Sequence, residues 1–172
     1  MIFRPDVRPL LLCVLLIAGC ATLPLPPRPA TESIVAFALS GRLAIRQGDT
    51  RHHVRIDWRH DVARDDILLT TPLGQGVAEI TRDAGGARLL LADQREFVAA
   101  DAASLSEQVF GFRLPFDQAA RWLLGESGHI APWRATVIER ESATPDALPS
   151  VIELERDDIH VRLKIDEWSE VR

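Results

Sequence analysis

Residues 37–60 read FALSGRLAIRQGDTRHHVRIDWRH, and this stretch decides the fold. The residues that share one face are Phe37, Leu39, Gly41, Leu43 and Ile45 in the first half, and Val54, Ile56 and Trp58 in the second. Polar or charged residues stand between most of them, and this period of two is typical of a strand with one buried face. The polar residues 47–50 join the two halves, so the stretch predicts an antiparallel hairpin.

Further strands follow on short connections. The predicted ranges are 67–71, 77–81, 87–91 and 96–99, and near the end of the chain 133–140, 151–156 and 159–166. Turn-forming residues separate several of them, such as the Asp-Ala-Gly-Gly segment at 83–86. Successive strands on short connections predict an antiparallel meander.

Between residues 101 and 125 the apolar period changes to that of a helix. Asp101 can cap a first helix that ends before Gly111, and a second helix is predicted from near Pro115 to Gly125. The apolar positions on one side are Ala102, Leu105 and Val109 in the first helix, and Phe116, Ala119, Trp122 and Leu123 in the second. We therefore expect a mainly β fold with some α: a curved antiparallel sheet with a helical insertion packed on its concave face.

The first twenty residues have the layout of an export signal. Arg4 and Arg8 precede an apolar run over residues 10–18, which is too short to span a bilayer because a transmembrane helix needs ~20 residues. The run ends in Ala-Gly before Cys20, a pattern that resembles the lipobox of bacterial lipoproteins. We therefore expect residues 1–19 to be a signal peptide and Cys20 to carry a covalent lipid.

One domain, residues 34–172, is expected to follow a tether over residues 20–33. Four prolines among residues 21–30 are incompatible with a helix or a sheet ladder and favour an extended chain. The other cysteine, Cys13, lies in the predicted leader, so no disulfide is expected in the mature chain. The domain therefore depends on its apolar core, which a 47% hydrophobic composition can supply.

The charge pattern argues against a nucleic-acid partner. Loss of Arg4, Arg8 and Asp6 with the leader changes the formal net charge from −5 to about −6. The only lysine is Lys164, and no run of basic residues occurs along the sequence. We therefore expect no polyanion-binding surface and no nucleic acid. Nothing in the sequence suggests an obligate dimer, so a monomer is expected.

No sequence motif points to an enzyme or a metal site. Gly-x-Ser-x-Gly, His-Glu-x-x-His and glycine-rich phosphate loops are missing, so no catalytic residue is predicted and no cofactor beyond the lipid. His52, His53 and His60 suggest metal ligands together with Asp57. On one strand, however, His52 and His60 lie ~26 Å apart, and His52 and His53 point to opposite faces. Surface histidines are the better interpretation.

Other ionisable residues receive equally plain interpretations. The Asp-Asp pairs at residues 65–66 and 157–158 stand where strands turn, and turns favour aspartate for its own reasons. His129 and His160 have no histidine or cysteine close in the sequence. We therefore expect turn residues in the first case and solvated side chains in the second.

Leu73 is unusual because it stands at the tip of a predicted turn. The turn, residues 71–76, reads TPLGQG. Tips of hairpins are normally polar, and an exposed leucine at such a tip gains nothing from folding. On the sequence alone, a Leu73 that folds back onto the sheet and a Leu73 that stays exposed remain equally open.

Several motifs in a fixed order resemble one family. They are the lipobox at Cys20, FALSGRLAI at 37–45, Trp58, LLTTPLG at 68–74, RWLLG at 121–125, Trp133-Arg134, Leu148-Pro149 and VRLKIDEW at 161–168. Together they cover nearly the whole mature chain, and the chain resembles the LolB family of outer-membrane lipoprotein receptors.

This resemblance implies an incomplete, open antiparallel β-barrel with a helical lid over an apolar cavity. The cavity would accept the acyl chains of client lipoproteins from the periplasmic carrier LolA and release them into the inner leaflet of the outer membrane. The protein would be anchored to that membrane through its lipid, with its domain facing the periplasm.

The expected cavity lining consists of inward-facing apolar residues. They are Leu39, Leu43, Val54, Ile56, Trp58, Leu105, Val109, Trp122, Leu123 and Trp168. For each of them, plain core packing is an equally good interpretation. In the same family the loop Pro72, Leu73 and Gly74 protrudes, which favours an exposed Leu73 that touches the membrane when cargo is released.

Two departures from the family pattern bear on the cavity. The chain before Leu39 is too short for the family's usual first helix, and the stretch from Gly125 to Trp133 leaves room for only an abbreviated strand.

Two other functions stay open as well. The half-barrel could serve as an envelope scaffold that binds a partner, and such a scaffold would be expected to have a filled interior. Alternatively, it could carry another lipid or glycolipid. An envelope hydrolase is a more distant third.

Overall fold

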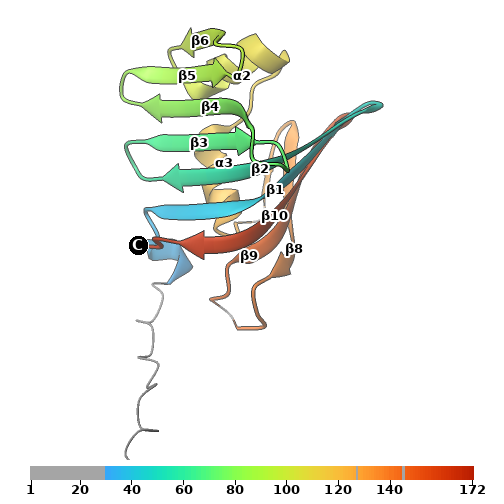
Figure 1. The fold of residues 1–172 in the computed structure, drawn as a ribbon. Helices are drawn as coiled ribbons and strands as arrows, with labels where there is room; N and C mark the ends of the chain where they lie inside the picture. The colour runs from blue at the N-terminus through green and yellow to red at the C-terminus, as the bar shows by residue number, and fades with distance from the viewer. Residues whose placement is uncertain (1–29, 127, 145) are drawn as a thin grey trace, which may run out of the picture.

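The computed structural model describes residues 30–126, 128–144 and 146–172, whose strands form one curved sheet (Figure 1). The predicted signal peptide, Cys20 and the tether up to residue 29 lie outside these residues. The strands are β1 (Phe37–Gln47), β2 (Thr50–His60), β3 (Asp65–Thr70), β4 (Gly76–Asp83), β5 (Gly86–Leu91), β6 (Glu96–Ala99), β7 (Gly128–Ile130), β8 (Trp133–Arg140), β9 (Pro149–Arg156) and β10 (Ile159–Ser169). The helices are the 3-10 turn η1 (Thr31–Ser33), α2 (Ala102–Phe110) and α3 (Phe116–Leu123).

The strand order is β6-β5-β4-β3-β2-β1-β10-β9-β8-β7, and all neighbours are antiparallel. Strands β1 and β10 are the neighbours that are not consecutive in the chain, and their pairing joins an N-terminal meander to a C-terminal one. The sheet does not close, because β6 and β7 end it as two edges. Both α-helices lie behind the same face of the sheet in Figure 1, which confirms the predicted curved sheet with a helical cover.

A glycine allows β1 and β10 to approach each other closely. The register shifts between Ser40 and Gly41, and a Cβ at Gly41 would lie 2.5 Å from the carbonyl oxygen of Lys164. Such a contact is too short for any side chain, so this bulge requires glycine. The bulge lies in the stretch of sequence on which the hairpin prediction rested.

The predicted helix ends are confirmed. The Asp101 carboxylate accepts a hydrogen bond of 2.6 Å from the backbone N–H of Ser104, and Gly111 ends α2 with a φ of 78°. Before β1, the described residues contain the short turn η1 and no longer helix, and β7 has three residues. Among the described residues, no helix has the length and hydropathy needed to cross a bilayer.

Asp65 is not a turn residue, which corrects the expectation from the sequence. Its side chain is buried in β3, between His60 of β2 and Arg82 of β4 in the sheet register. The carboxylate accepts hydrogen bonds from Trp58 Nε1 at 2.8 Å and from Arg82 Nε, and lies 2.6 Å from His60 Nδ1. His60 is thus part of a buried polar cluster and is not a free surface histidine.

The same contacts set the charge of Asp65. Burial raises the pKa of this carboxyl, but the hydrogen bonds from His60, Trp58 and Arg82 outweigh burial and hold the pKa below its ordinary value of 3.8. The pKa of Asp65 is lower in the folded protein than in the unfolded chain. The cluster therefore contributes its full stabilisation at pH values above the ordinary pKa of 3.8. The stabilisation is lost as the pH falls through the folded pKa.

We predict that Asp65→Asn lowers the free energy of unfolding by about 3 kcal/mol at neutral pH, since it removes a buried charge and leaves the half-buried Arg82 without its anion. The matched control Asp66→Asn removes an exposed ion pair with Arg64 and costs less than about 1 kcal/mol. Urea unfolding at several pH values measures both. The difference in the free energy of unfolding between wild type and Asp65→Asn should decrease in acid. A difference that does not change with pH would contradict the assigned role of the charge.

Candidate functional site

An apolar cavity of about 300 Å³ lies between the sheet and the segment from Phe110 to Leu123. The strand residues that line it are Leu43, Ile45, Ile56, Trp58, Ile67, Leu69, Ile80, Trp133, Ile152, Leu154, Ile159, Val161 and Leu163. Two exposed polar residues, Gln47 and His52, border it near the end of the β1–β2 hairpin. The volume is at the lower end of the range of ligand pockets.

The cover of the cavity is the connector between α2 and α3 together with one side of α3. Its lining residues are Phe110, Phe112, Leu114, Pro115, Phe116, Ala119, Trp122 and Leu123. Among the hydrogen bonds that hold the connector, Leu114 N–H donates to Ser106 Oγ at 2.7 Å, and Trp133 Nε1 donates to the Arg113 carbonyl at 3.1 Å. The buried Ser106 thus ties the connector to α2, and Trp133 ties it to the sheet.

Half of the residues expected to line the cavity border it. These five are Leu43, Ile56, Trp58, Trp122 and Leu123. They come from β1, β2 and α3, so the predicted hairpin and the second helix do face the same apolar space. Contact with an acyl chain remains an expectation for each of them.

The other five do not border the cavity, and four of them, Leu39, Leu105, Val109 and Trp168, belong to the core instead. Leu39 faces both Trp58 and Trp168 in the register, and all three are buried. The Trp168 ring packs edge-on against Phe37 at 5.3 Å between centroids, and its indole N–H donates to the Pro149 carbonyl at 2.9 Å. Leu39, Phe37 and Trp168 thus fill the core at one end of the sheet.

Leu105 and Val109 belong to α2, which packs against β5 and β6. That end of the sheet lies beyond the cavity, so both residues contribute to the core instead. Val54 is half-buried and lies opposite Leu43 in the register, on the same face of the sheet, but it does not line the cavity. These positions are corrections to the predicted lining.

Sequence reasoning missed most of the lining, and two groups of residues show why. Ile159, Val161 and Leu163 come from β10, where apolar residues alternate with polar ones, but this strand was not connected with the cavity. Phe112 and Leu114 come from the connector, which has no helical or strand period to mark its inner side. Alternation in β10 was a usable signal, whereas the connector gave none.

The loop between β3 and β4 holds Leu73 away from the sheet, with 90% of its surface exposed. Thr71 N–H donates to the Gln75 carbonyl at 2.7 Å, and Gly74 N–H donates to the Thr71 carbonyl at 2.9 Å. Gly74 has a φ of 85°, which favours glycine at that position. A hydrogen-bonded turn therefore presents a bare leucine, and Pro72 beside it is exposed as well.

The remaining ionisable candidates form no metal site. Within residues 30–126, 128–144 and 146–172, no group of three or more His, Cys, Asp or Glu side chains could hold a metal ion. His52, His53 and His129 are exposed, and His160 lies 3.3 Å from Glu155.

Comparison with known proteins identifies the family. The family model described as Outer membrane lipoprotein LolB matches residues 35–144, from before β1 to the end of β8 and beyond. The chain belongs to the LolB family. Two relatives named Outer-membrane lipoprotein LolB, from Dechloromonas aromatica and Chromobacterium violaceum, share 35% and 34% identity with this LolB-family chain. The first alignment covers 94% of this chain and 96% of the relative, and the second covers 92% and 96%.

A solved structure supports the fold of this LolB-family chain. The crystal structure of a LolA superfamily protein from Nitrosomonas europaea matches it with a TM-score of 0.50 and 8% sequence identity. The match covers 80% of this chain and 86% of that structure. At this identity the likeness concerns the fold alone, an open curved sheet with a helical cover.

We predict that Ala119→Trp, which adds an indole to a half-buried lining position of α3, weakens binding of an apolar fluorescent probe about tenfold. The matched control Arg121→Trp places the same ring on the exposed side of the helix and leaves probe binding unchanged. Fluorescence titration at neutral pH measures both, and thermal unfolding checks that the fold is kept. Equal binding by the two variants would place the probe outside the cavity.

Proposed function

We propose that this LolB-family protein is a receptor anchored to the outer membrane that accepts acylated lipoproteins and inserts them into that membrane. The observation that carries the proposal is the apolar cavity between the sheet and its helical cover. An exposed acyl chain costs about 0.8 kcal/mol for each CH₂ group in contact with water. A cavity with an apolar lining lowers this cost without any covalent step.

The donor of the cargo in this proposal is the periplasmic carrier LolA, and the domain faces the periplasm on a lipid attached to Cys20. Transfer between two apolar cavities needs only a difference in affinity at each step. Neither a nucleotide nor a metal is part of this scheme.

The size of the cavity adds a requirement to the proposal. About 300 Å³ is little room for the several acyl chains of a lipoprotein, so the cover moves when cargo enters. The connector, residues 111–115, is the part of the cover outside α2 and α3. Besides the hydrogen bonds of Leu114 and Trp133, it is held by ion pairs of Arg113 with Asp101 and Glu107 and by the Phe112 ring against Trp133.

The alternatives from the sequence are less well supported. A scaffold built on the same half-barrel would be expected to have a filled interior, so the cavity argues against the scaffold function. A carrier of another lipid or glycolipid would use the same apolar lining, and the family membership favours lipoprotein cargo over it.

The exposed loop at Leu73 suits the delivery step. An apolar side chain at the tip of a closed turn can enter a bilayer without unfolding its surroundings. Burial of one leucine side chain stabilises the membrane contact by about 1.5–3 kcal/mol. We therefore assign Leu73 to contact with the outer membrane during release of cargo.

The central test is transfer of a labelled lipoprotein from the carrier into liposomes by the mature chain with Cys20→Ala. Transfer would support the receptor function. If the chain takes up no cargo from the carrier although its fold is intact, the proposal is wrong and the scaffold function is favoured.

In the same assay we predict that Leu73→Glu accepts cargo normally but delivers it more slowly by a factor of about ten or more, as expected from loss of the leucine burial. The matched control Gln75→Glu adds the same charge to the same loop and keeps Leu73. It should deliver nearly as fast as wild type. Normal delivery by Leu73→Glu would remove the loop from the mechanism.

A further inference from the structure

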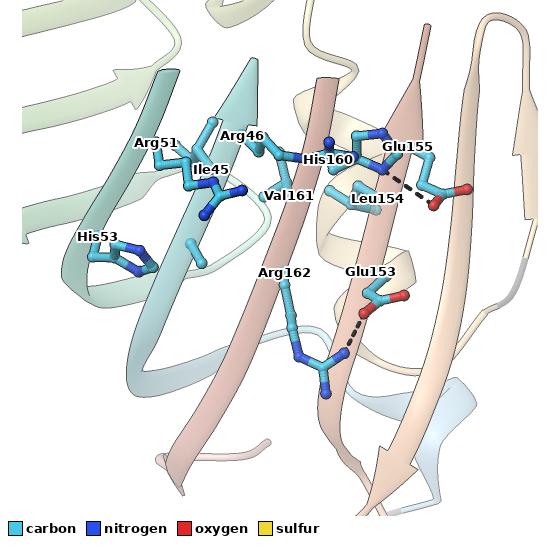
Figure 2. A pocket seen from close by; sticks show the side chains of 11 residues that line it. Ile45, Arg46, Arg51, His53, Glu153, Leu154, Glu155, His160, Val161 and Arg162 are labelled. Atoms are coloured by element: carbon cyan, nitrogen blue, oxygen red, sulfur yellow. Dashed lines mark hydrogen bonds and ion pairs between the residues drawn. The ribbon is translucent and has the colours of Figure 1, made fainter. Parts of the chain in front are cut away.

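Six basic side chains gather on the outer face of the three central strands, although the chain as a whole is acidic with a net charge of −5. We call them the basic strip: Arg51 and Arg55 on β2, Arg42 and Arg46 on β1, and Arg162 and Lys164 on β10. All six are exposed. Figure 2 shows Arg51 and Arg46 close together on β2 and β1, with Arg162 further along the neighbouring β10.

The strand register places like charges directly opposite each other. Arg42 faces Arg55 on one side and Lys164 on the other, and Arg46 faces Arg51. Like charges in directly opposed positions of a sheet destabilise it. The arrangement therefore has an electrostatic cost that a bound anion would relieve.

Only part of this charge is neutralised within the molecule. Arg42 pairs with Asp166, and Arg162 pairs with Glu153. In the described parts of the chain, Arg46, Arg51, Arg55 and Lys164 have no ion pair. Four positive charges are thus available to a partner.

The basic strip is continuous with the base of the exposed loop. A depression of about 390 Å³ on the outer face is bordered by Arg42, Arg55, Arg162 and Lys164, and also by Pro72 next to Leu73. In the register, Arg55 faces Thr70, the residue that ends β3 just before the loop. The exposed loop and the basic strip therefore adjoin each other on the outer face.

We propose that the basic strip binds the phosphates of anionic phospholipids in the membrane that Leu73 enters. An apolar tip beside unpaired basic side chains is the combination that holds a protein at an anionic bilayer surface. The inference rests on the proposed delivery step, and it adds a preference for the lipid into which cargo is released.

The test measures binding of the mature chain with Cys20→Ala to two kinds of vesicle, phosphatidylcholine alone and equal parts phosphatidylcholine and phosphatidylglycerol. Without the covalent lipid, membrane binding depends on the protein surface, so the contribution of the basic strip to binding can be measured. Every described strand lies in residues 37–169, within the mature chain. Wild type should bind the phosphatidylglycerol vesicles more strongly, and added salt should reduce this difference.

The variant Arg55→Gln/Lys164→Gln removes two cations that have no ion pair in the described structure. It should weaken binding to phosphatidylglycerol vesicles about 30-fold and leave binding to phosphatidylcholine unchanged. The fold should be at least as stable as wild type, because both residues oppose Arg42. The matched control Arg88→Gln/Arg121→Gln removes two cations elsewhere and should bind as wild type does.

A companion variant separates headgroup contact from apolar insertion. Leu73→Ser should weaken binding to both kinds of vesicle by the same factor. The proposal is overturned if wild type does not distinguish the vesicles, or if the strip variant binds both as wild type does.

The proposal is also overturned if the strip variant binds vesicles normally but takes cargo from the carrier more slowly, since the partner would then be an acidic protein surface. Vesicle binding needs no cargo. Failure of cargo uptake would therefore reject the proposed function alone. The vesicle assay would still decide whether the basic strip binds anionic phospholipids.

Discussion

The pairing of β1 with β10 is the constraint on which the rest of the structure depends. It is the contact that joins the two meanders, and it brings lining residues of the hairpin, such as Leu43, beside those of the last strand, such as Leu163. The close approach at Gly41 and the bulge beside it lie in this pairing. Residues far apart in the chain thus form one wall of the cavity, and the same pairing aligns the outward-facing cations on the opposite face.

Much of the fold follows from local pattern. Period-two alternation located the strands, and Asp101 and Gly111 marked the ends of α2, because capping depends on residues adjacent in sequence. The adjacency of β1 and β10 has no local signal, since their residues meet only after folding. The buried role of Asp65 escaped prediction for the same reason: its partners His60 and Arg82 come from two other strands.

The cavity was predicted in kind and only partly in detail. Alternation tells which face of a strand is buried, and it gave Leu43, Ile56 and Trp58 correctly as neighbours of the cavity. It does not tell how far along the strand the core is filled, so Leu39 and Trp168 were assigned to the lining although they pack together. The exposure of Leu73 was open from the sequence alone, and the hydrogen-bonded turn accounts for it.

The two edges of the sheet have a consequence for the behaviour of many copies at one surface. Strand β6 has four residues and β7 has three, so each edge offers another chain only a short row of free backbone groups. Helix α2 also packs against β5 and β6. A large open sheet normally risks edge-to-edge aggregation. Here the edge strands β6 and β7 are too short to pair stably with a strand of another chain. Crowding on a membrane is thereby tolerated without closing the barrel.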